Sequence, residues 1–204
     1  MKQTLLVEGK DDQHVIWALC QQYGLPENFV VKAADGIENL FQQLPVRLKE
    51  ADVRTVGVII DADTDIDRRW ATVRSIFKEK MPNFPEQPNP EGIIFEQENL
   101  KVGVWLMPDN QLSGMLETFI HFLIPSEDNL RPFVEAHLTE IEQAGLNRYR
   151  PIHKDKALIH AWLALQEDPG TPIGQSITKK YLTTDAEQCQ KLIAWLSNLF
   201  NSVV

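Results

Sequence analysis

The feature that most constrains the fold is an unbroken apolar run, Val56-Gly57-Val58-Ile59-Ile60, which ends directly at Asp61. A strand with one solvent-exposed face alternates polar and apolar residues, whereas a run without alternation is typical of a strand covered on both faces. Such strands belong mostly to parallel sheets with helices packed on each side. The run therefore predicts a central parallel strand in an α/β protein.

The segments around this run alternate between strand and helix patterns. Short apolar runs predict strands, and apolar residues that recur every three or four positions predict helices. Strands are expected at residues 4–7, 29–31, 56–60, 93–95 and 102–106, and helices at residues 11–23, 36–48, 66–81 and 115–123. Because the two patterns alternate along the chain, we expect a mostly parallel sheet flanked by helices.

The residues after position 124 carry helix patterns only. An N-cap pattern at Ser126, followed by acidic residues, predicts a helix that runs to about Gly145. Thr184 opens a capping-box pattern and so predicts the start of the last helix. We therefore expect an α/β core at residues 1–124 and a helical extension at residues 125–204 that packs on this core.

Charge and composition limit the partners. The formal net charge of -9 argues against a broad basic face for nucleic acid, so a polyanionic substrate has to be held locally by a metal or a small Lys/Arg cluster. No apolar run approaches the roughly 20 residues of a membrane span, and we expect no membrane partner. The N-terminal residues lack a signal-peptide pattern, and Cys20 and Cys189 lack C-x-x-C spacing, so a reducing cytoplasm without zinc is expected.

Carboxylates follow two of the predicted strands at the point where each strand ends. Glu8 follows the first strand, and Asp61 and Asp63 follow the central one. In an open parallel sheet, ligands bind outside the carboxyl ends of the strands. If the two strands are neighbours, these side chains face one crevice and repel each other unless a cation lies between them. Mg²⁺ or Mn²⁺ is the expected cofactor, because such ions bind carboxylate oxygens.

Asp12 is a further candidate metal ligand with a simpler alternative. Asp11 and Asp12 lie where a helix is expected to begin, and the helix dipole favours acidic side chains there without any metal. An Asp at the end of a strand is also common as a turn or helix cap. The combination of Glu8 with Asp61 and Asp63, rather than any one of these residues, therefore favours a metal site.

The motif Glu8-Gly9-Lys10-Asp11-Asp12 after a strand, followed by Asp61-Ala62-Asp63 after the core strand, resembles the Toprim domain of primases, topoisomerases, ribosomal RNA maturases and OLD-family nucleases. The resemblance covers residues 1–124. It implies a Rossmann-like sheet, a magnesium site, and phosphodiester chemistry on nucleic acid or a nucleotide phosphate. The stretch from Val104 to Glu117 is similar to stand-alone, OLD-related Toprim proteins of unassigned function.

The resemblance also assigns roles to single residues. It implies that Glu117 is a further metal ligand, although a helix dipole explains an acidic residue there equally well. It implies that Lys156, or alternatively Lys154, matches a lysine of the OLD nucleases, and that Glu8 is a general acid or base or a shared ligand. The implied ligands are Glu8, Asp12, Asp61, Asp63 and Glu117. The chain lacks the G-x-x-x-x-G-K-S/T phosphate loop of the OLD ATPase, so only the metal centre carries over.

Two alternatives to a metal-dependent nuclease or phosphotransferase-type hydrolase stay open. Asp61-Ala62-Asp63-Thr64 is also the nucleophile motif of haloacid-dehalogenase-like phosphatases, in which Asp61 attacks phosphorus. That motif usually opens its domain and is followed by an acidic pair, and it leaves Glu8 unexplained. The other alternative is a Toprim-like binding or regulatory module without catalysis. The oligomeric state is also open, with a homodimer as one alternative.

Overall fold

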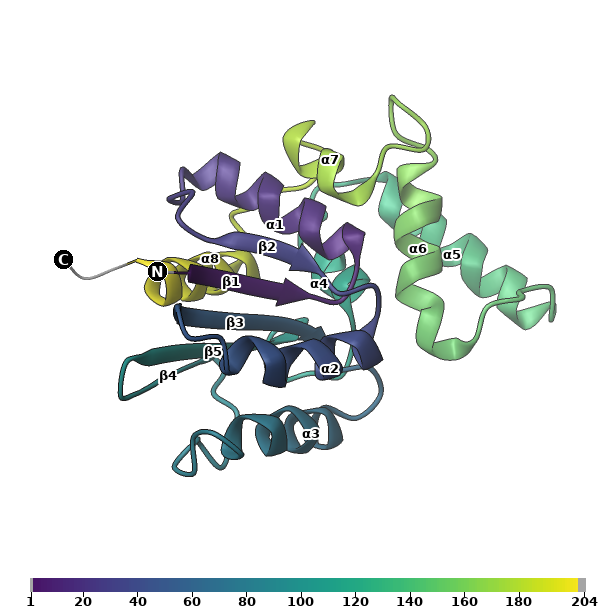
Figure 1. Cartoon of the computed structure of the whole chain (residues 1–204). Coiled ribbons are helices and arrows are strands. Elements are labelled where there is room, and N and C mark those ends of the chain that lie inside the picture. Colours follow the sequence, from purple (N-terminus) through teal and green to yellow (C-terminus); the bar gives the residue numbers. More distant parts are fainter. Residues whose placement is uncertain (1, 202–204) are drawn as a thin grey trace.

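A five-stranded sheet with the order β2-β1-β3-β5-β4 forms the centre of the protein, of which a computed structural model describes residues 2–201 (Figure 1). Strands β2, β1, β3 and β5 are parallel, and β4 is antiparallel to β5. The predicted α/β class with a mostly parallel sheet is thereby confirmed. The strands are β1 (Lys2–Val7), β2 (Val30–Ala33), β3 (Val53–Asp61), β4 (Ile93–Gln97) and β5 (Leu100–Met107).

Helices cover both faces of the sheet (Figure 1). One face carries α2 (Ile37–Leu48) and α3 (Ile66–Lys78), and the other carries α1 (Lys10–Tyr23), α4 (Leu116–Phe122) and α8 (Glu187–Phe200). The remaining helices are α5 (Leu130–Gln143), α6 (Lys154–Leu163), which a short 3-10 turn (Pro151–His153) precedes, and α7 (Ile173–Thr178), which packs on α1. Figure 1 shows α5 and α6 beyond the carboxyl ends of the strands. Within residues 2–201, no helix is long and apolar enough to cross a membrane.

Both faces of β3 are buried, which explains its apolar sequence. Val56, Val58 and Ile60 belong to the core cluster under α2 and α3, whereas Ile59 belongs to the cluster on the opposite face. Successive side chains of a strand point to opposite faces, so a strand with helices on each side needs apolar residues at every position. The central position predicted for this strand is confirmed, because β3 lies between β1 and β5.

Two glycines let α8 lie directly on the sheet. Gly57 of β3 and Gly103 of β5 are register partners in neighbouring strands. A Cβ atom at Gly57 would lie 2.8 Å from Leu199 Cδ2, and a Cβ atom at Gly103 would lie 2.6 Å from the same atom. On the same helix, the Trp195 ring N–H donates a hydrogen bond of 2.9 Å to the Ile93 carbonyl. The C-terminal helix therefore shares one core with the sheet.

Helix α5 begins later than its sequence pattern predicts. It starts at Leu130 and not near Ser126, and it ends at Gln143. The Asp128 carboxylate accepts a hydrogen bond of 2.6 Å from the Arg131 backbone N–H, so the acidic residue, and not the serine, satisfies one of the free backbone donors of the first turn. The expected N-cap at Ser126 is therefore wrong.

The capping box expected at Thr184 is wrong for a different reason. Helix α8 begins at Glu187, and Ala186 is its N-cap without a side-chain hydrogen bond. The Thr184 hydroxyl instead accepts hydrogen bonds from the Gln22 amide at 2.7 Å and the Tyr23 hydroxyl at 3.0 Å. The Thr184 side chain, which the local sequence pattern assigns to the helix cap, therefore binds α1 instead.

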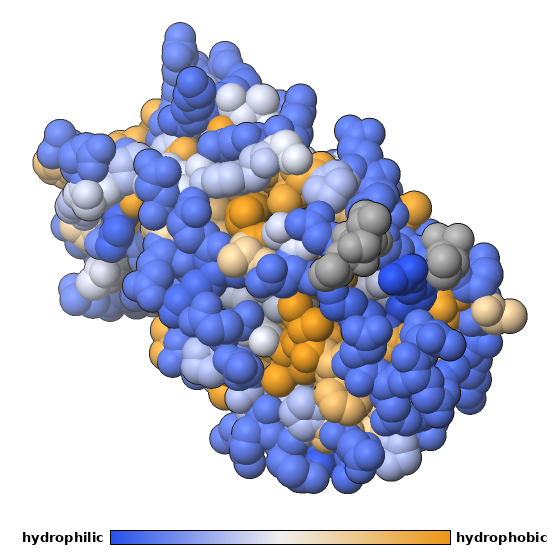
Figure 2. Space-filling view, turned by 90° about the vertical axis from the view of Figure 1, so that its left-hand side faces the viewer, coloured by the Kyte–Doolittle hydropathy of each residue, from blue (hydrophilic) through white to orange (hydrophobic). Residues whose placement is uncertain are grey.

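The amino-terminal edge of the sheet is shown in Figure 2, which views the left-hand side of Figure 1. Hydrophilic residues cover most of this face, with hydrophobic patches between them. Ion pairs at this edge connect β1 and α2 to Glu50. Lys2 Nζ lies 2.5 Å from Glu50 Oε2, and Arg47 pairs with the same carboxylate. The carboxyl ends of the parallel strands β2, β1, β3 and β5 lie at the opposite side of the molecule.

Candidate metal centre

The carboxyl ends of β1 and β3 open into a pocket of about 530 Å³, which we call the acidic pocket. The two strands are neighbours, with Val7 paired to Ile59, so the residues that end them come side by side. All five predicted metal ligands and Lys156 line this pocket. Its acidic residues are Glu8, Asp11, Asp12, Asp35, Asp61, Asp63 and Glu117, and its basic residues are Lys10, His153 and Lys156.

The side chain of Glu8 is in direct contact with the backbone of Asp61. Glu8 Oε1 accepts a hydrogen bond of 2.7 Å from the Asp61 backbone N–H. Asp61 Oδ1 in turn accepts one of 3.0 Å from the Leu116 backbone N–H at the start of α4. These bonds fix the orientation of both carboxylates and leave each with further lone pairs. The chain therefore holds the ends of β1 and β3 and the start of α4 in one arrangement.

Asp12 is buried, with 7% of its surface exposed. Its Oδ2 accepts a hydrogen bond of 3.0 Å from the Gly9 backbone N–H, whereas its Oδ1 is buried without a hydrogen-bond partner. A buried carboxylate oxygen without a partner is costly, so it marks a place where a cation or a proton fits. Asp12 therefore belongs to the acidic pocket and is not only a residue in the first turn of α1.

Burial and mutual repulsion raise the pKa values of three carboxylates. Burial, followed by the charge of Glu8, raises the pKa of Asp12 to about 7. Burial, followed by the charges of Asp12 and Glu8, holds the pKa of Asp61 well above its ordinary value. Burial also raises the pKa of Glu8, against the opposing effect of its hydrogen bond from Asp61. A divalent cation in the pocket would favour the charged form of all three.

Asp63 is the first of two carboxylates that already have a cationic partner. It forms an ion pair with Arg69 of α3. Its backbone is in the left-handed region, with φ 55°, and its N–H donates a hydrogen bond of 2.8 Å to the Gly114 carbonyl. The turn after β3 is thereby tied to the loop that precedes α4, and the carboxylate is directed to Arg69.

Glu117 is the second carboxylate with a cationic partner. It is buried, with 4% exposed, and its Oε1 lies 2.9 Å from Lys156 Nζ. The hydrogen bond to Glu117 raises the pKa of Lys156, which therefore keeps its charge. Lys154 instead lies 2.7 Å from Glu142 Oε2 and does not line the acidic pocket. The structure thus brings Lys156, and not Lys154, to the predicted ligands.

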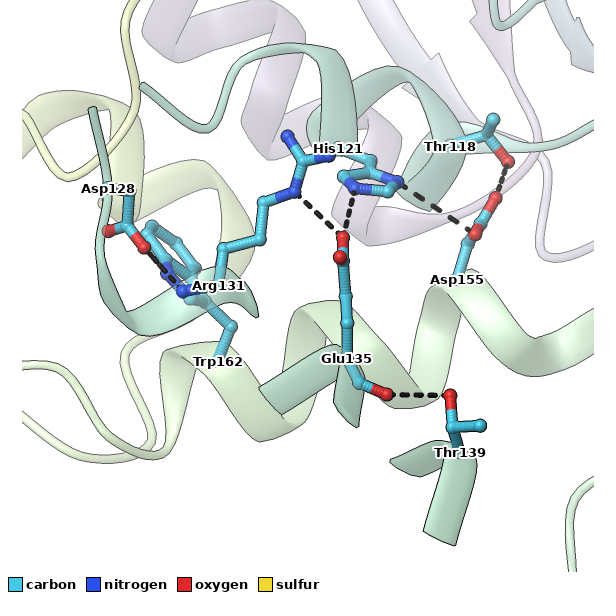
Figure 3. Close-up of polar contacts among 8 residues, drawn as sticks. All are labelled: Thr118, His121, Asp128, Arg131, Glu135, Thr139, Asp155 and Trp162. Carbon is cyan, nitrogen blue, oxygen red and sulfur yellow. Dashed lines mark hydrogen bonds and ion pairs between the residues drawn. The ribbon is translucent and has the colours of Figure 1, made fainter. Parts of the chain in front are cut away.

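Contacts among α4, α5 and α6 hold the first turn of α6, to which Asp155 and Lys156 belong, and Figure 3 shows Asp155 with its partners. The Thr118 hydroxyl on α4 donates a hydrogen bond of 2.6 Å to Asp155, the residue before Lys156 on α6. His121 lies between two carboxylates, with Nε2 3.3 Å from Glu135 Oε1 and Nδ1 4.0 Å from Asp155 Oδ1. The start of α6 is therefore held against the helix that carries Glu117.

The donor set fits a hard divalent cation if Asp63 and Glu117 leave their cationic partners. Within residues 2–201, no three His, Cys, Asp or Glu side chains are already arranged to hold a metal ion. Asp63 and Glu117 are directed to Arg69 and Lys156. The predicted ligands supply only oxygen atoms, which Mg²⁺ and Mn²⁺ accept, and Asp12 Oδ1 is an oxygen without a partner.

Arg69, Asp155 and His153 are among the residues around the pocket that were not predicted from the sequence, as is Asp35. Arg69 lies on α3, where a basic residue on a polar helix face is usually solvated. Asp155 lies beside Lys156 in a polar segment, and His153 lies in the 3-10 turn before it. No spacing connects any of them with Glu8 or Asp61, because the connection is made by tertiary packing.

The fold and the pocket define an α/β protein with a mostly parallel, Rossmann-like sheet and an acidic pocket at the carboxyl ends of its strands. The chain belongs to the DUF3226 family, which is described as "protein of unknown function" and whose model matches residues 2–201. The comparisons with curated proteins and with solved structures gave no match. The family model thus spans both the sheet and the C-terminal helices.

Proposed function

We propose that this protein is a Mg²⁺-dependent phosphoryl-transfer protein of the Toprim type that cleaves phosphodiester bonds in nucleic acid. The observation that carries the proposal is the convergence of Glu8, Asp12 and Asp61 in the acidic pocket. Among residues 2–201, none of the three forms an ion pair, and burial raises the pKa of each. Such a group of carboxylates is stabilised by a divalent cation.

The side chains divide into ligands and proton-transfer groups. Asp61, Asp63 and Glu117 would hold the cation, with Asp12 beside them. When bound, Mg²⁺ would neutralise charge on the oxygens of the phosphate. Glu8, whose pKa is raised by burial, is suited to take a proton from the attacking group or to return one to the leaving group.

Basic residues at the rim of the acidic pocket support a phosphate-containing substrate. Lys10, His153 and Lys156 line the same pocket as the carboxylates. The chain as a whole carries a net charge of -9, so these groups give a local and not a general attraction for a polyanion. Lys156 Nζ can donate a hydrogen bond to a phosphate oxygen while its charge is retained.

A binding module without catalysis is the second candidate. The ion pairs of Asp63 with Arg69 and of Glu117 with Lys156 favour it, because they neutralise two of the five predicted ligands with the protein's own cations. A phosphatase that uses Asp61 as nucleophile has less support. Asp61 as a nucleophile would leave Glu8 and the buried Asp12 in the same pocket without a role.

The test is Mg²⁺-dependent cleavage of end-labelled single-stranded DNA, double-stranded DNA and RNA, with Glu8→Gln and Asp61→Asn as variants. Each variant is expected to lower the cleavage rate by about a hundredfold or more, because a proton-transfer group or a metal ligand is lost. The matched control is Asp67→Asn, which removes the same charge from an exposed position on α3 and is expected to cleave at the natural rate.

Two results would contradict the nuclease proposal. Bound Mn²⁺ without turnover of DNA, RNA or phosphomonoesters would identify a binding module. An aspartyl-phosphate trapped on Asp61 during turnover of a phosphomonoester would identify a phosphatase.

A further inference from the structure

A second pocket, of about 340 Å³, lies beside the acidic pocket, and Asp63 lines both. It lies between the first turns of α2 and α3, and its basic lining residues are Arg68 and Arg69. The ion pair between Arg69 and Asp63 therefore stands at the boundary of the two pockets. We call this second pocket the arginine pocket.

Arg69 is held at this boundary by two contacts. Its guanidinium pairs with the Asp63 carboxylate, and its Cζ lies 5.8 Å from the centre of the Phe41 ring. The side chain is mostly buried, with 15% exposed. Its charge also lowers the pKa of Glu8, so the guanidinium acts on the acidic pocket from across the boundary. The Arg69 guanidinium thus holds the position at the Asp63 carboxylate that a bound metal ion would take.

A divalent cation and Arg69 compete for the same carboxylate. Both bind the Asp63 oxygens, and a divalent cation repels a guanidinium. If the cation takes Asp63, Arg69 loses its anionic partner, and a mostly buried guanidinium without an anion is costly. A phosphate group is a suitable replacement, because the planar donors of arginine match its oxygens.

The other charged groups of the arginine pocket are already engaged or exposed. Asp65 caps α3, and its Oδ1 accepts a hydrogen bond of 2.9 Å from the Arg68 backbone N–H. Glu38 in the first turn of α2 and the Arg68 side chain are exposed. Arg69 is therefore the lining residue whose partner changes when a metal takes Asp63.

We propose that Arg69 couples metal binding to substrate binding: a divalent cation at Asp63 displaces the guanidinium, which then binds a phosphate group of nucleic acid in the arginine pocket. This inference rests on the metal site of the proposed function. A phosphate that binds Arg69 frees Asp63 for the metal, and a metal on Asp63 frees Arg69 for the phosphate. Each ligand therefore raises the affinity for the other by the same factor.

The test compares natural protein with Arg69→Gln in two binding assays that do not depend on turnover. Mn²⁺ affinity without nucleic acid is measured by electron paramagnetic resonance and is expected to rise about tenfold in Arg69→Gln, because the competing cation is gone. The affinity for short fluorescein-labelled single-stranded DNA is measured by anisotropy with and without Ca²⁺. The factor by which Ca²⁺ raises the affinity for DNA, which we call the Ca²⁺ gain, is expected to fall about tenfold in the variant.

Lys78→Gln is the matched control, because it removes the same charge from the last turn of the same helix, outside both pockets. It is expected to match natural protein in both assays. Unlabelled RNA should compete for the same site as the labelled DNA, since the phosphate group is the ligand.

The outcomes separate this inference from the proposed function. Natural Mn²⁺ affinity and natural Ca²⁺ gain in Arg69→Gln would overturn the coupling and leave the metal site intact. Weaker Mn²⁺ binding in Arg69→Gln would overturn it as well, because Arg69 would then support Asp63 as a ligand. A natural chain that binds no Mn²⁺ would overturn both.

Discussion

Asp12 lies in the first turn of α1, where the helix dipole alone accounts for an acidic side chain. A carboxylate can interact with the helix dipole while it is exposed to solvent, as the neighbouring Asp11 is. Asp12, in contrast, is 7% exposed, and its Oδ1 has no hydrogen-bond partner. We therefore expect Asp12 to lower the stability of the metal-free protein and, under the proposed function, to be stabilised by a cation in the acidic pocket.

The pH dependence of stability tests this explanation. The pKa of Asp12 is about 7 in the folded protein, against an ordinary value of 3.8. Between these values the folded protein holds a proton that the unfolded chain has lost, so the free energy of unfolding falls as the pH rises through this range. At about 1.4 kcal/mol per pH unit, the full loss is about 4 kcal/mol. Asp12→Asn is expected to remove this loss in metal-free urea denaturation.

The control for this prediction is Asp11→Asn, which removes a charge from the exposed neighbour and should keep the natural pH dependence. Added Mg²⁺ should stabilise natural protein more at pH 8 than at pH 5, because the carboxylates must lose their protons to bind it. Denaturation curves of Asp12→Asn that follow the natural pH dependence would count against a proton held at Asp12.

At the scale of elements, α8 and the sheet depend on each other through the two glycines. Gly103→Ala places a Cβ atom 2.6 Å from Leu199 Cδ2 and 2.9 Å from the Trp195 ring. We expect a loss of about 1–3 kcal/mol in the free energy of unfolding from this overpacking, measured by urea denaturation.

The paired variant Leu199→Ala gives the control. If the clash is the cause, Gly103→Ala should cost less in the Leu199→Ala background than in natural protein, because the shortened side chain makes room. Strictly additive losses would show that the cost arises within β5 and not at its contact with α8.

The sequence predicts elements well where periodicity decides them, and less well where tertiary contacts do. The strands and the placement of Glu8 and Asp61 follow from apolar runs that end in carboxylates. The start of α8 does not follow, because Thr184 bonds to α1 and not to its own helix. The role of Arg69 is also hidden, since its partner Asp63 belongs to another element. Helix α7 has too few residues for a periodic pattern.

At the scale of the whole molecule, chemistry is expected at one side only. The carboxylates and Lys156 meet at the carboxyl ends of the strands, where α5 and α6 also lie (Figure 1). The amino-terminal edge instead carries the ion pairs of Glu50 with Lys2 and Arg47. The C-terminal helices therefore have two tasks: α8 completes the core of the sheet, and α6 brings Lys156 to the acidic pocket.

The central claim, a divalent-metal site in the acidic pocket with Asp61 among its ligands, is tested most directly by titrating metal-free protein with Mn²⁺ and counting free ions by electron paramagnetic resonance. Natural protein is expected to bind Mn²⁺ saturably. Asp61→Asn should weaken this binding by about tenfold or more, while Asp67→Asn should bind as natural protein does. Natural protein that leaves all Mn²⁺ free, or an Asp61→Asn variant with natural affinity, would contradict the claim.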